Sequence, residues 1–361
     1  MEEKQKTTGE KRREALLYQQ KNGYDCLSPA DESAMRAYSE DYKKFLDSSM
    51  TEREAGDTAI SLAEARGFKP LVRGMELRPG DKVYRSNRGK AVMLAVVGSQ
   101  PLDQGAKIGA AHIDSPRLDL KPNPLYEDNE LAYFKTHYYG GIRKYQGGAV
   151  PVSMHGVVMK ADGETVEVSI GEKEGDPQFC VTDLLPHLAA EQNGRKLGEG
   201  LKGEELNIII GSIPYHDEEN EKIKNPAKLL AMKLLNDRYG ITEKDFTRAE
   251  IEMVPAYKAV DIGLDRGLIG SYGQDDRVCA YTALMAEIAA ENPEHTTFTI
   301  LTDKEEIGSV GNTGLHSDYV HHAVEDLAES FGADTKTVLR HSICLSSDVN
   351  AAYDPTFASV Y

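Results

Sequence analysis

Short apolar runs that alternate with helical segments constrain this 361-residue chain more than any other feature of its sequence. Four runs have the length and composition of strands, the last two of them of buried strands: 91–97, 107–114, 296–301 and 342–345. Helical spacing covers 278–290 and about 318–331. Strands that alternate with helices are typical of a mostly parallel sheet flanked by helices, so the expected fold class is α/β.

The N-terminal region is expected to be helical after a polar arm of about 20 residues. Residues 33–47 have helical spacing. Thr51 and Glu54 match a capping box, which predicts the start of a second helix that ends near Gly67.

The composition and periodicity of the sequence change after Pro122. Gly and Pro clusters and short alternating runs such as 165–170 replace the longer periodic segments there. We interpret residues 123–245 as an inserted, largely β domain. Residues 1–122 and 246–361 then form one discontinuous α/β domain with helices on its sheet.

Composition excludes several classes of function. A net charge of −17 disfavours binding to nucleic acid, because such a surface repels phosphate backbones. The four cysteines are scattered and form no CxxC pair, which favours a reducing, cytoplasmic compartment. The N-terminus lacks the apolar core of a signal peptide, and no run of 18 apolar residues predicts a membrane span.

Four short motifs lie at expected strand ends or strand-helix turns, where sites form in open α/β sheets. They contain His112 with Asp114, Asp275 in GQDDR, Glu305 with Glu306, and Asp348. Each has an ordinary structural explanation when taken alone. These explanations are a satisfied histidine, a helix N-cap with Arg277 as its counter-ion, a solvated turn, and a turn-forming aspartate.

The four motifs are more informative together than separately. One histidine and several carboxylates at successive strand ends of one sheet make a nitrogen-oxygen ligand set without sulfur. Such a set suits zinc, manganese or cobalt, and a shared carboxylate could hold two ions about 3.5–4 Å apart. Paired glutamates also allow one side chain to bind metal while the other moves a proton.

At this point the chain resembles the M18 (aspartyl aminopeptidase-like) metallo-aminopeptidases, in motif order and spacing, from about residue 15 onward. The segments that carry the resemblance are AAHIDSPRLDLKP, YYGGIRKYQ, LIGSYGQDDR, TDKEEIGSVG and SSDVNAAYDP. The resemblance implies a zinc-peptidase-like catalytic domain and an inserted oligomerisation domain. It also implies a homo-oligomer, built from dimers up to a dodecamer, that acts on peptides.

The resemblance assigns roles to particular residues. Four would bind the two divalent ions, with zinc expected and manganese or cobalt as alternatives: His112, Asp275, Glu306 and Asp348. Asp275 would bridge the ions and precede a cis peptide bond. Asp114 would orient His112, and Glu305 would act as the general base. His187 would enter the active site of a neighbouring subunit and help to stabilise the oxyanion.

One expected feature is missing. The family's last metal ligand is a histidine in a late LSMHAP-like segment that this sequence lacks. The resemblance therefore implies either a fragment of a longer gene product or a natural short form that has lost activity. The missing ligand favours, as an alternative, a non-catalytic scaffold or oligomerisation partner. A separate alternative is an M42- or M20-like peptidase or deacylase that needs no free amine, because those families share the HxD, Asp and Glu-Glu motifs.

Overall fold

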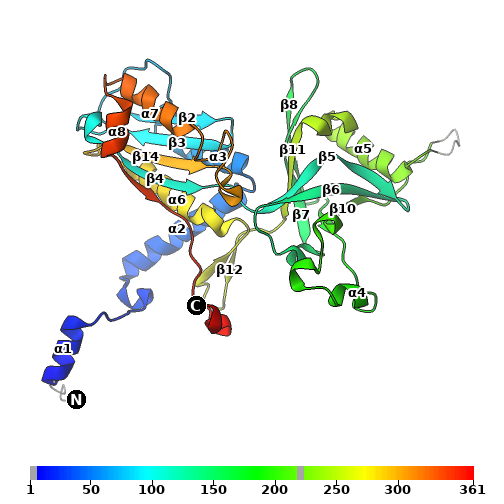
Figure 1. Ribbon diagram of the computed structural model, residues 1–361, viewed down its shortest axis with the longest axis horizontal. Coiled ribbons are helices and arrows are strands. Elements are labelled where there is room, and N and C mark those ends of the chain that lie inside the picture. Colours follow the sequence, from blue (N-terminus) through cyan, green and yellow to red (C-terminus); the bar gives the residue numbers. More distant parts are fainter. Residues whose placement is uncertain (1–5, 218–222) are drawn as a thin grey trace. The chain divides into compact units, whose positions relative to one another are not determined.

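The structure is a computed structural model that describes residues 6–217 and 223–361. Contacts within the chain divide it into two units, Met1–Lys43 and Lys44–Tyr361, and each is described here by itself (Figure 1).

The first unit contains a short helix within the expected polar arm. Helix α1 (Thr8–Leu16) buries no residue and is stabilised locally, because Thr7 and Glu10 form a capping box. A 3₁₀ turn (Gly23–Cys26) follows, and α2 (Pro29–Asp47) begins in this unit and ends in the second. The predicted polar arm thus contains a helix that was not predicted, and the helix expected at 33–47 lies within α2.

Helix α3 (Glu52–Glu64) opens the second unit as the sequence predicts. The Glu54 backbone N–H donates to Thr51 Oγ1 over 3.2 Å, and the Thr51 N–H donates to the Glu54 carboxylate over 3.1 Å. This capping box satisfies two amides that the first turn leaves without helical partners. Ala55, Ala59 and Ala63 recur every four residues and bury one face of the helix.

A six-stranded sheet forms the α/β part of the second unit. Its strands, in spatial order, are β1 (Lys69–Pro70), β2 (Lys82–Asn87), β3 (Ala91–Val96), β14 (Thr297–Thr302), β4 (Lys107–His112) and β15 (Ile343–Ser346). The pairs β1–β2, β14–β4 and β4–β15 are parallel, whereas β2–β3 and β3–β14 are antiparallel. The predicted α/β class with a mostly parallel sheet is confirmed.

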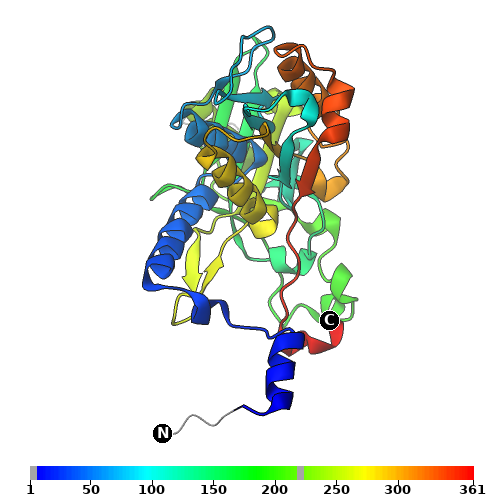
Figure 2. The same cartoon turned by 90° about the vertical axis from the view of Figure 1, so that its left-hand side faces the viewer.

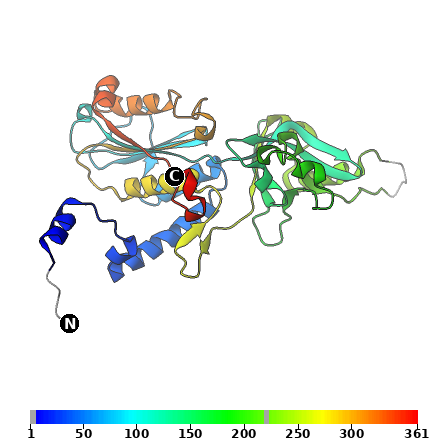
Figure 3. The ribbon, with the colours of Figure 1, turned by 60° about the horizontal axis from the view of Figure 1, so that its bottom comes forward.

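Helices cover both faces of this sheet. Helices α3 and α6 (Gln274–Ala289) contact one face, and α7 (Tyr319–Glu329) packs on the other together with α8 (Thr335–His341) (Figure 3). Every residue of β3 is buried, as expected for a strand covered on both sides. The sequence did not predict α8, which buries a single residue, Val338.

Strand β15 corrects one expectation. It was predicted to be buried, but within the described residues it pairs with β4 alone and forms the edge of the sheet (Figure 2). Ile343 and Leu345 are consequently 62% and 70% exposed. An apolar run shows that a strand can be buried but does not reveal whether another strand or helix covers it.

The second sheet is antiparallel and closes on itself. Its strands are β5 (Arg117–Asp128), β6 (Leu131–Tyr139), β7 (Pro151–Met159), β8 (Thr165–Ile170), β9 (Phe179–Val181), β10 (Ile208–Gly211) and β11 (Ala249–Pro255). Because β11 pairs with both β5 and β7, six strands close into a ring, which we call the barrel. Strand β8 extends the barrel beside β7. These strands run from 117 to 255.

Two further helices and a two-stranded ribbon also belong to the second unit. Helix α5 (Pro226–Tyr239) contacts β5, β6 and β10, whereas α4 (Ala190–Asn193) is a single turn. Strands β12 (Val260–Ile262) and β13 (Leu268–Gly270) form a separate two-stranded ribbon. Among the helices of the described chain, none is both long and apolar enough to cross a membrane.

A buried histidine joins α3 to the barrel. The side chain of His155 on β7 is 2% exposed, and its Nδ1 lies 2.8 Å from Glu54 Oε1. Its Nε2 lies 2.9 Å from Ser153 Oγ and 3.5 Å from Glu172 Oε1. Burial disfavours the charged ring, but the hydrogen bonds and charges of Glu172 and Glu54 outweigh it and raise the pKa of His155 to about 9.

This contact predicts a loss of stability at alkaline pH. The folded pKa lies above the unfolded value of about 6.5, so the stabilisation is fully present below pH 6.5 and disappears as the pH rises through about 9. We expect the free energy of unfolding in urea to fall by up to about 3 kcal/mol over this range. His155→Gln should make this dependence shallower without abolishing it, because the pKa of His112 is also raised to about 9, and equal slopes in the two proteins would contradict the assignment.

Candidate metal centre

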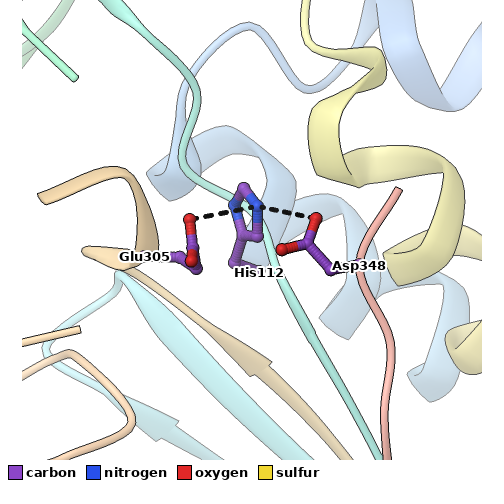
Figure 4. A group of neighbouring side chains, drawn as sticks. All are labelled: His112, Glu305 and Asp348. Atoms are coloured by element: carbon purple, nitrogen blue, oxygen red, sulfur yellow. Dashed lines mark ion pairs between the residues drawn. The ribbon is translucent and has the colours of Figure 1, made fainter. Parts of the chain in front are cut away.

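The candidate metal centre lies at the carboxyl end of β4, the strand that ends at His112. Because β4 lies between the parallel strands β14 and β15, all three strands end at the same edge of the sheet. His112 is the last residue of β4 and pairs in register with Thr302 of β14. Figure 4 shows its ring between Glu305, which follows β14, and Asp348, which follows β15. Register therefore brings together residues more than 190 positions apart.

The two nitrogens of His112 have different environments. Nδ1 lies 3.0 Å from the backbone oxygen of Asp114 and 3.3 Å from its carboxylate. Nε2 is buried without a hydrogen-bond partner, although Asp275, Glu305 and Asp348 oxygens lie 3.2, 3.7 and 3.9 Å away. Burial disfavours the imidazolium, but Asp114 outweighs it and raises the pKa of His112 to about 9. A buried nitrogen that faces carboxylates fits a metal ligand.

The Asp114 side chain accepts hydrogen bonds from Tyr139 and from two backbone amides, and it lies against Nδ1 of His112. The Tyr139 hydroxyl donates to its Oδ2 over 2.6 Å, and the backbone amides of Glu305 and Glu306 donate over 3.2 and 3.3 Å. Although burial opposes ionisation, the bonds from His112 and Tyr139 keep the pKa of Asp114 below its usual value. The Arg117 guanidinium lies 3.8 Å from the centre of the Tyr139 ring.

The sequence analysis did not identify Tyr139 as part of this site. Its hydrogen bond to Asp114 leads to a prediction about metal affinity. Tyr139→Phe removes the hydroxyl that holds Asp114 but keeps the ring against Arg117. We expect the dissociation constant for zinc, measured by competition with a chromogenic chelator, to rise about 10-fold.

The matched control is Tyr239→Phe, which removes a hydroxyl that donates to the Ser169 carbonyl over 2.8 Å in the barrel. It should leave the zinc affinity unchanged. Equal zinc affinities in Tyr139→Phe and wild type would show that Tyr139 only packs there.

Two adjacent aspartates at the start of α6 differ in exposure. A cis peptide bond joins them, as the resemblance implied. The side chain of Asp275 is 57% exposed, whereas Asp276 is fully buried and neither of its carboxylate oxygens has a hydrogen-bond partner. Burial raises the pKa of Asp276 to about 6. Both aspartates have non-helical backbone angles, the Asp276 oxygens accept no capping hydrogen bond, and Arg277 donates to the Met50 carbonyl, so the structure does not support an aspartate cap with Arg277 as counter-ion.

The glutamate pair follows β14 in a short 3₁₀ turn (Glu305–Ile307). Glu305 is 44% exposed and Glu306 is half-buried. Burial, with a further contribution from Asp275, raises the pKa of Glu306 to about 7. The two side chains thus have different surroundings, which suits different tasks.

Three groups of side chains in the described residues place one ligand atom each within 4.8 Å of one another. The groups are His112 with Glu305 and Asp348, His112 with Asp275 and Glu306, and Asp275 with Asp276 and Asp348. The structure thus brings together all four predicted ligands and Glu305. It adds Asp276, which the sequence contains in the same motif but to which no role was assigned. His187 is exposed and belongs to none of these groups.

Comparison with known proteins identifies the family. The family model described as aminopeptidase I zinc metalloprotease (M18) matches residues 45–361. The chain belongs to the M18 peptidases. It is therefore a metallo-aminopeptidase by family, a hydrolase of peptide bonds that depends on a divalent metal, and the M42 and M20 alternatives are set aside.

Curated M18 relatives resemble nearly the whole chain. An M18 family aminopeptidase 1 of Clostridium acetobutylicum is 46% identical over 354 residues, which cover 96% of this chain and 75% of the relative. The corresponding Thermotoga maritima protein is 45% identical over 336 residues, which cover 91% and 72%.

Solved M18 structures agree with this fold. An M18 aminopeptidase from Thermotoga maritima superposes with a TM-score of 0.88 at 43% identity and covers 95% of this chain, which spans 75% of that structure. Aminopeptidase I from Clostridium acetobutylicum gives 0.87 at 42% identity, with the same coverage. The mApe1 dodecamer of S. cerevisiae, at 20% identity and a TM-score of 0.70, shares the fold.

Proposed function

We propose that this chain removes N-terminal amino acids from peptides by hydrolysis at a centre for two divalent ions. The observation that carries the proposal is the buried His112 Nε2, which lacks a hydrogen-bond partner and faces three carboxylates. Each pair of the three groups shares one residue, which is His112, Asp348 or Asp275. Of these we assign the bridging position to Asp275, because the M18 resemblance implies it and a carboxylate has two oxygens that two ions could share.

We assign metal binding to four residues of the centre and proton transfer to a fifth. His112, Asp275, Glu306 and Asp348 would hold the ions, which when bound would polarise the scissile carbonyl and lower the pKa of the attacking water. Glu305 accepts the proton of that water and delivers it to the leaving amine.

Asp114 contacts Nδ1 of His112 and thereby orients the ring so that Nε2 faces the carboxylates of the centre. We assign the free α-amine of the substrate to the open side of the centre, beside the ions and near the carboxylates of Asp275 and Asp348, whose side chains are 57% and 54% exposed. A free amine is thus favoured over a blocked one, which makes the enzyme an exopeptidase.

We also infer that the chain forms a homo-oligomer through the inserted barrel domain, predicted at 123–245 and built from strands between 117 and 255. Three exposed leucines flank His187 in a loop that a neighbouring subunit could bury: Leu184, Leu185 and Leu188. A related fold forms a dodecamer in S. cerevisiae. A monomer in light scattering would exclude this inference. All four cysteines are unpaired, which supports the predicted cytoplasmic location.

The test is an assay of the chain on Asp-, Glu- and Leu-linked chromogenic amides with zinc, manganese or cobalt. We expect release of the amine that a chelator abolishes and added metal restores, and no release from N-acetylated substrates. A protein that binds zinc tightly yet releases nothing from any substrate would favour the non-catalytic scaffold instead.

A further inference from the structure

A cavity of about 440 Å³ lies beside the metal centre. Its walls come from the start of β5, the turn after β6, the end of β11 and the segment that precedes α6. Its apolar lining includes Leu118, Ile142, Val152, Leu206 and Met253. Cavities of this size, mainly apolar with a few polar groups, are typical of small-molecule and side-chain pockets.

The cavity shares one wall with the centre, because Asp275 belongs to both. A substrate residue with its side chain in the cavity therefore places its backbone beside the carboxylates of the centre. A carboxylate stabilises a free amine but gains little from the uncharged amide nitrogen of the next residue. The cavity thus suits the side chain of the N-terminal residue.

The charges in the cavity wall do not favour an acidic side chain. Arg117 lines the cavity, but its guanidinium is already engaged by three carboxylates. Its nitrogens lie 2.9 Å from Asp119, 3.1 Å from Glu252 and 3.5 Å from Glu52. The other basic residue of the lining, Arg143, is exposed and lies over the Tyr145 ring at 5.2 Å. A carboxylate in the cavity would lose hydration without gaining an unpaired buried cation.

We propose that this cavity receives the side chain of the substrate's N-terminal residue and selects uncharged, apolar residues of the size of leucine, methionine and phenylalanine. The proposal rests on the aminopeptidase function proposed above and specifies its substrate class. Ile142, which is half-buried on the turn after β6, is the specificity-determining side chain that can be altered with least disturbance of the core.

The experiment measures kcat/KM for the metal-loaded chain on Xaa-Gly-Gly peptides, with Leu, Met, Phe, Ala, Asp or Glu as Xaa. We expect the apolar residues to exceed Asp and Glu by at least about 10-fold. Ile142→Ala should lower the value for the Leu peptide about 10-fold and that for the Ala peptide far less. Ile142→Lys should raise the Glu-to-Leu ratio. Ile213→Ala, which truncates an isoleucine that is 67% exposed, is the matched control and should change neither ratio.

Binding provides a second readout that needs no turnover. Calorimetry on Glu305→Gln should give tighter binding of Leu-Gly-Gly than of Glu-Gly-Gly, and Ile142→Ala in that background should reduce the difference. A wild-type chain that cleaves no peptide would refute the aminopeptidase function itself. Three results would overturn only the cavity assignment: a preference for Asp or Glu that Arg143→Gln abolishes, indifference to Ile142, or an Ile142 effect confined to the second residue of the peptide.

Discussion

Glu305→Gln is expected to lower kcat/KM by about 10²–10⁴-fold, the range typical for loss of a general acid-base group. The amide keeps the size of the side chain but cannot accept the proton of the attacking water. Glu305 is 44% exposed, lies 3.7 Å from His112 Nε2 and is held at its backbone by Asp114. The substitution should therefore leave both the fold and the position of the other ligands intact.

Zinc affinity separates the two roles that the geometry allows for Glu305. As a general base it should be dispensable for metal binding, so Glu305→Gln should bind zinc like the wild type. A loss of zinc comparable to that caused by His112→Ala would make it a ligand, in line with its grouping with His112 and Asp348. Glu291→Gln, which alters an exposed glutamate, is the control and should keep full activity.

Arg117→Met is expected to destabilise the protein by about 3–5 kcal/mol, the cost of leaving buried charges without their partner. The Arg117 side chain is 4% exposed and bridges Glu52 of α3, Asp119 of β5 and Glu252 of β11. Burial opposes the ionisation of Glu52, but Arg117 and Lys90 hold its pKa well below its ordinary value. Methionine fills similar space yet leaves these carboxylates with Lys90 as the nearest cation for Glu52, at 3.0 Å.

Urea unfolding at neutral pH measures this loss. Because Glu52 and Arg117 interact directly, adding Glu52→Gln to Arg117→Met should cost less than the sum of the single changes. Arg73→Met removes an exposed arginine paired with Glu329 and should have no resolvable effect. A mild effect of Arg117→Met, within the range of the Arg73 control, would show that water reaches the cluster.

Local patterns predicted the elements of the fold well where the signal is short-range. The capping box at Thr51 and Glu54, the alternation at 165–170 and the apolar runs of β3, β4 and β14 all appear in the structure. Helix α8 and the exposure of β15 were not predicted, since both depend on which other elements pack nearby.

The sequence predicted the ligands of the candidate site but not the residue that holds Asp114 in place. His112 ends a strand, and Glu305 and Asp348 follow strands. Because parallel strands end at the same edge of a sheet, the motifs predicted that these side chains would lie close together. Tyr139 carries no such signal. It lies at the end of a barrel strand, and its hydroxyl reaches Asp114 only because β6 pairs with β5, which follows that motif.

The sequence alone therefore determined the α/β class, the M18 resemblance and the identity of the predicted ligands, because strand and helix periods and short motifs are local properties of the chain. Tertiary structure decided the rest. Register places His112 opposite Thr302, closure of β11 onto β5 and β7 forms the barrel, and the packing of both sheets creates the Arg117 cluster and the cavity beside Asp275. These features join residues up to about two hundred positions apart, and no local pattern records which distant side chains will meet.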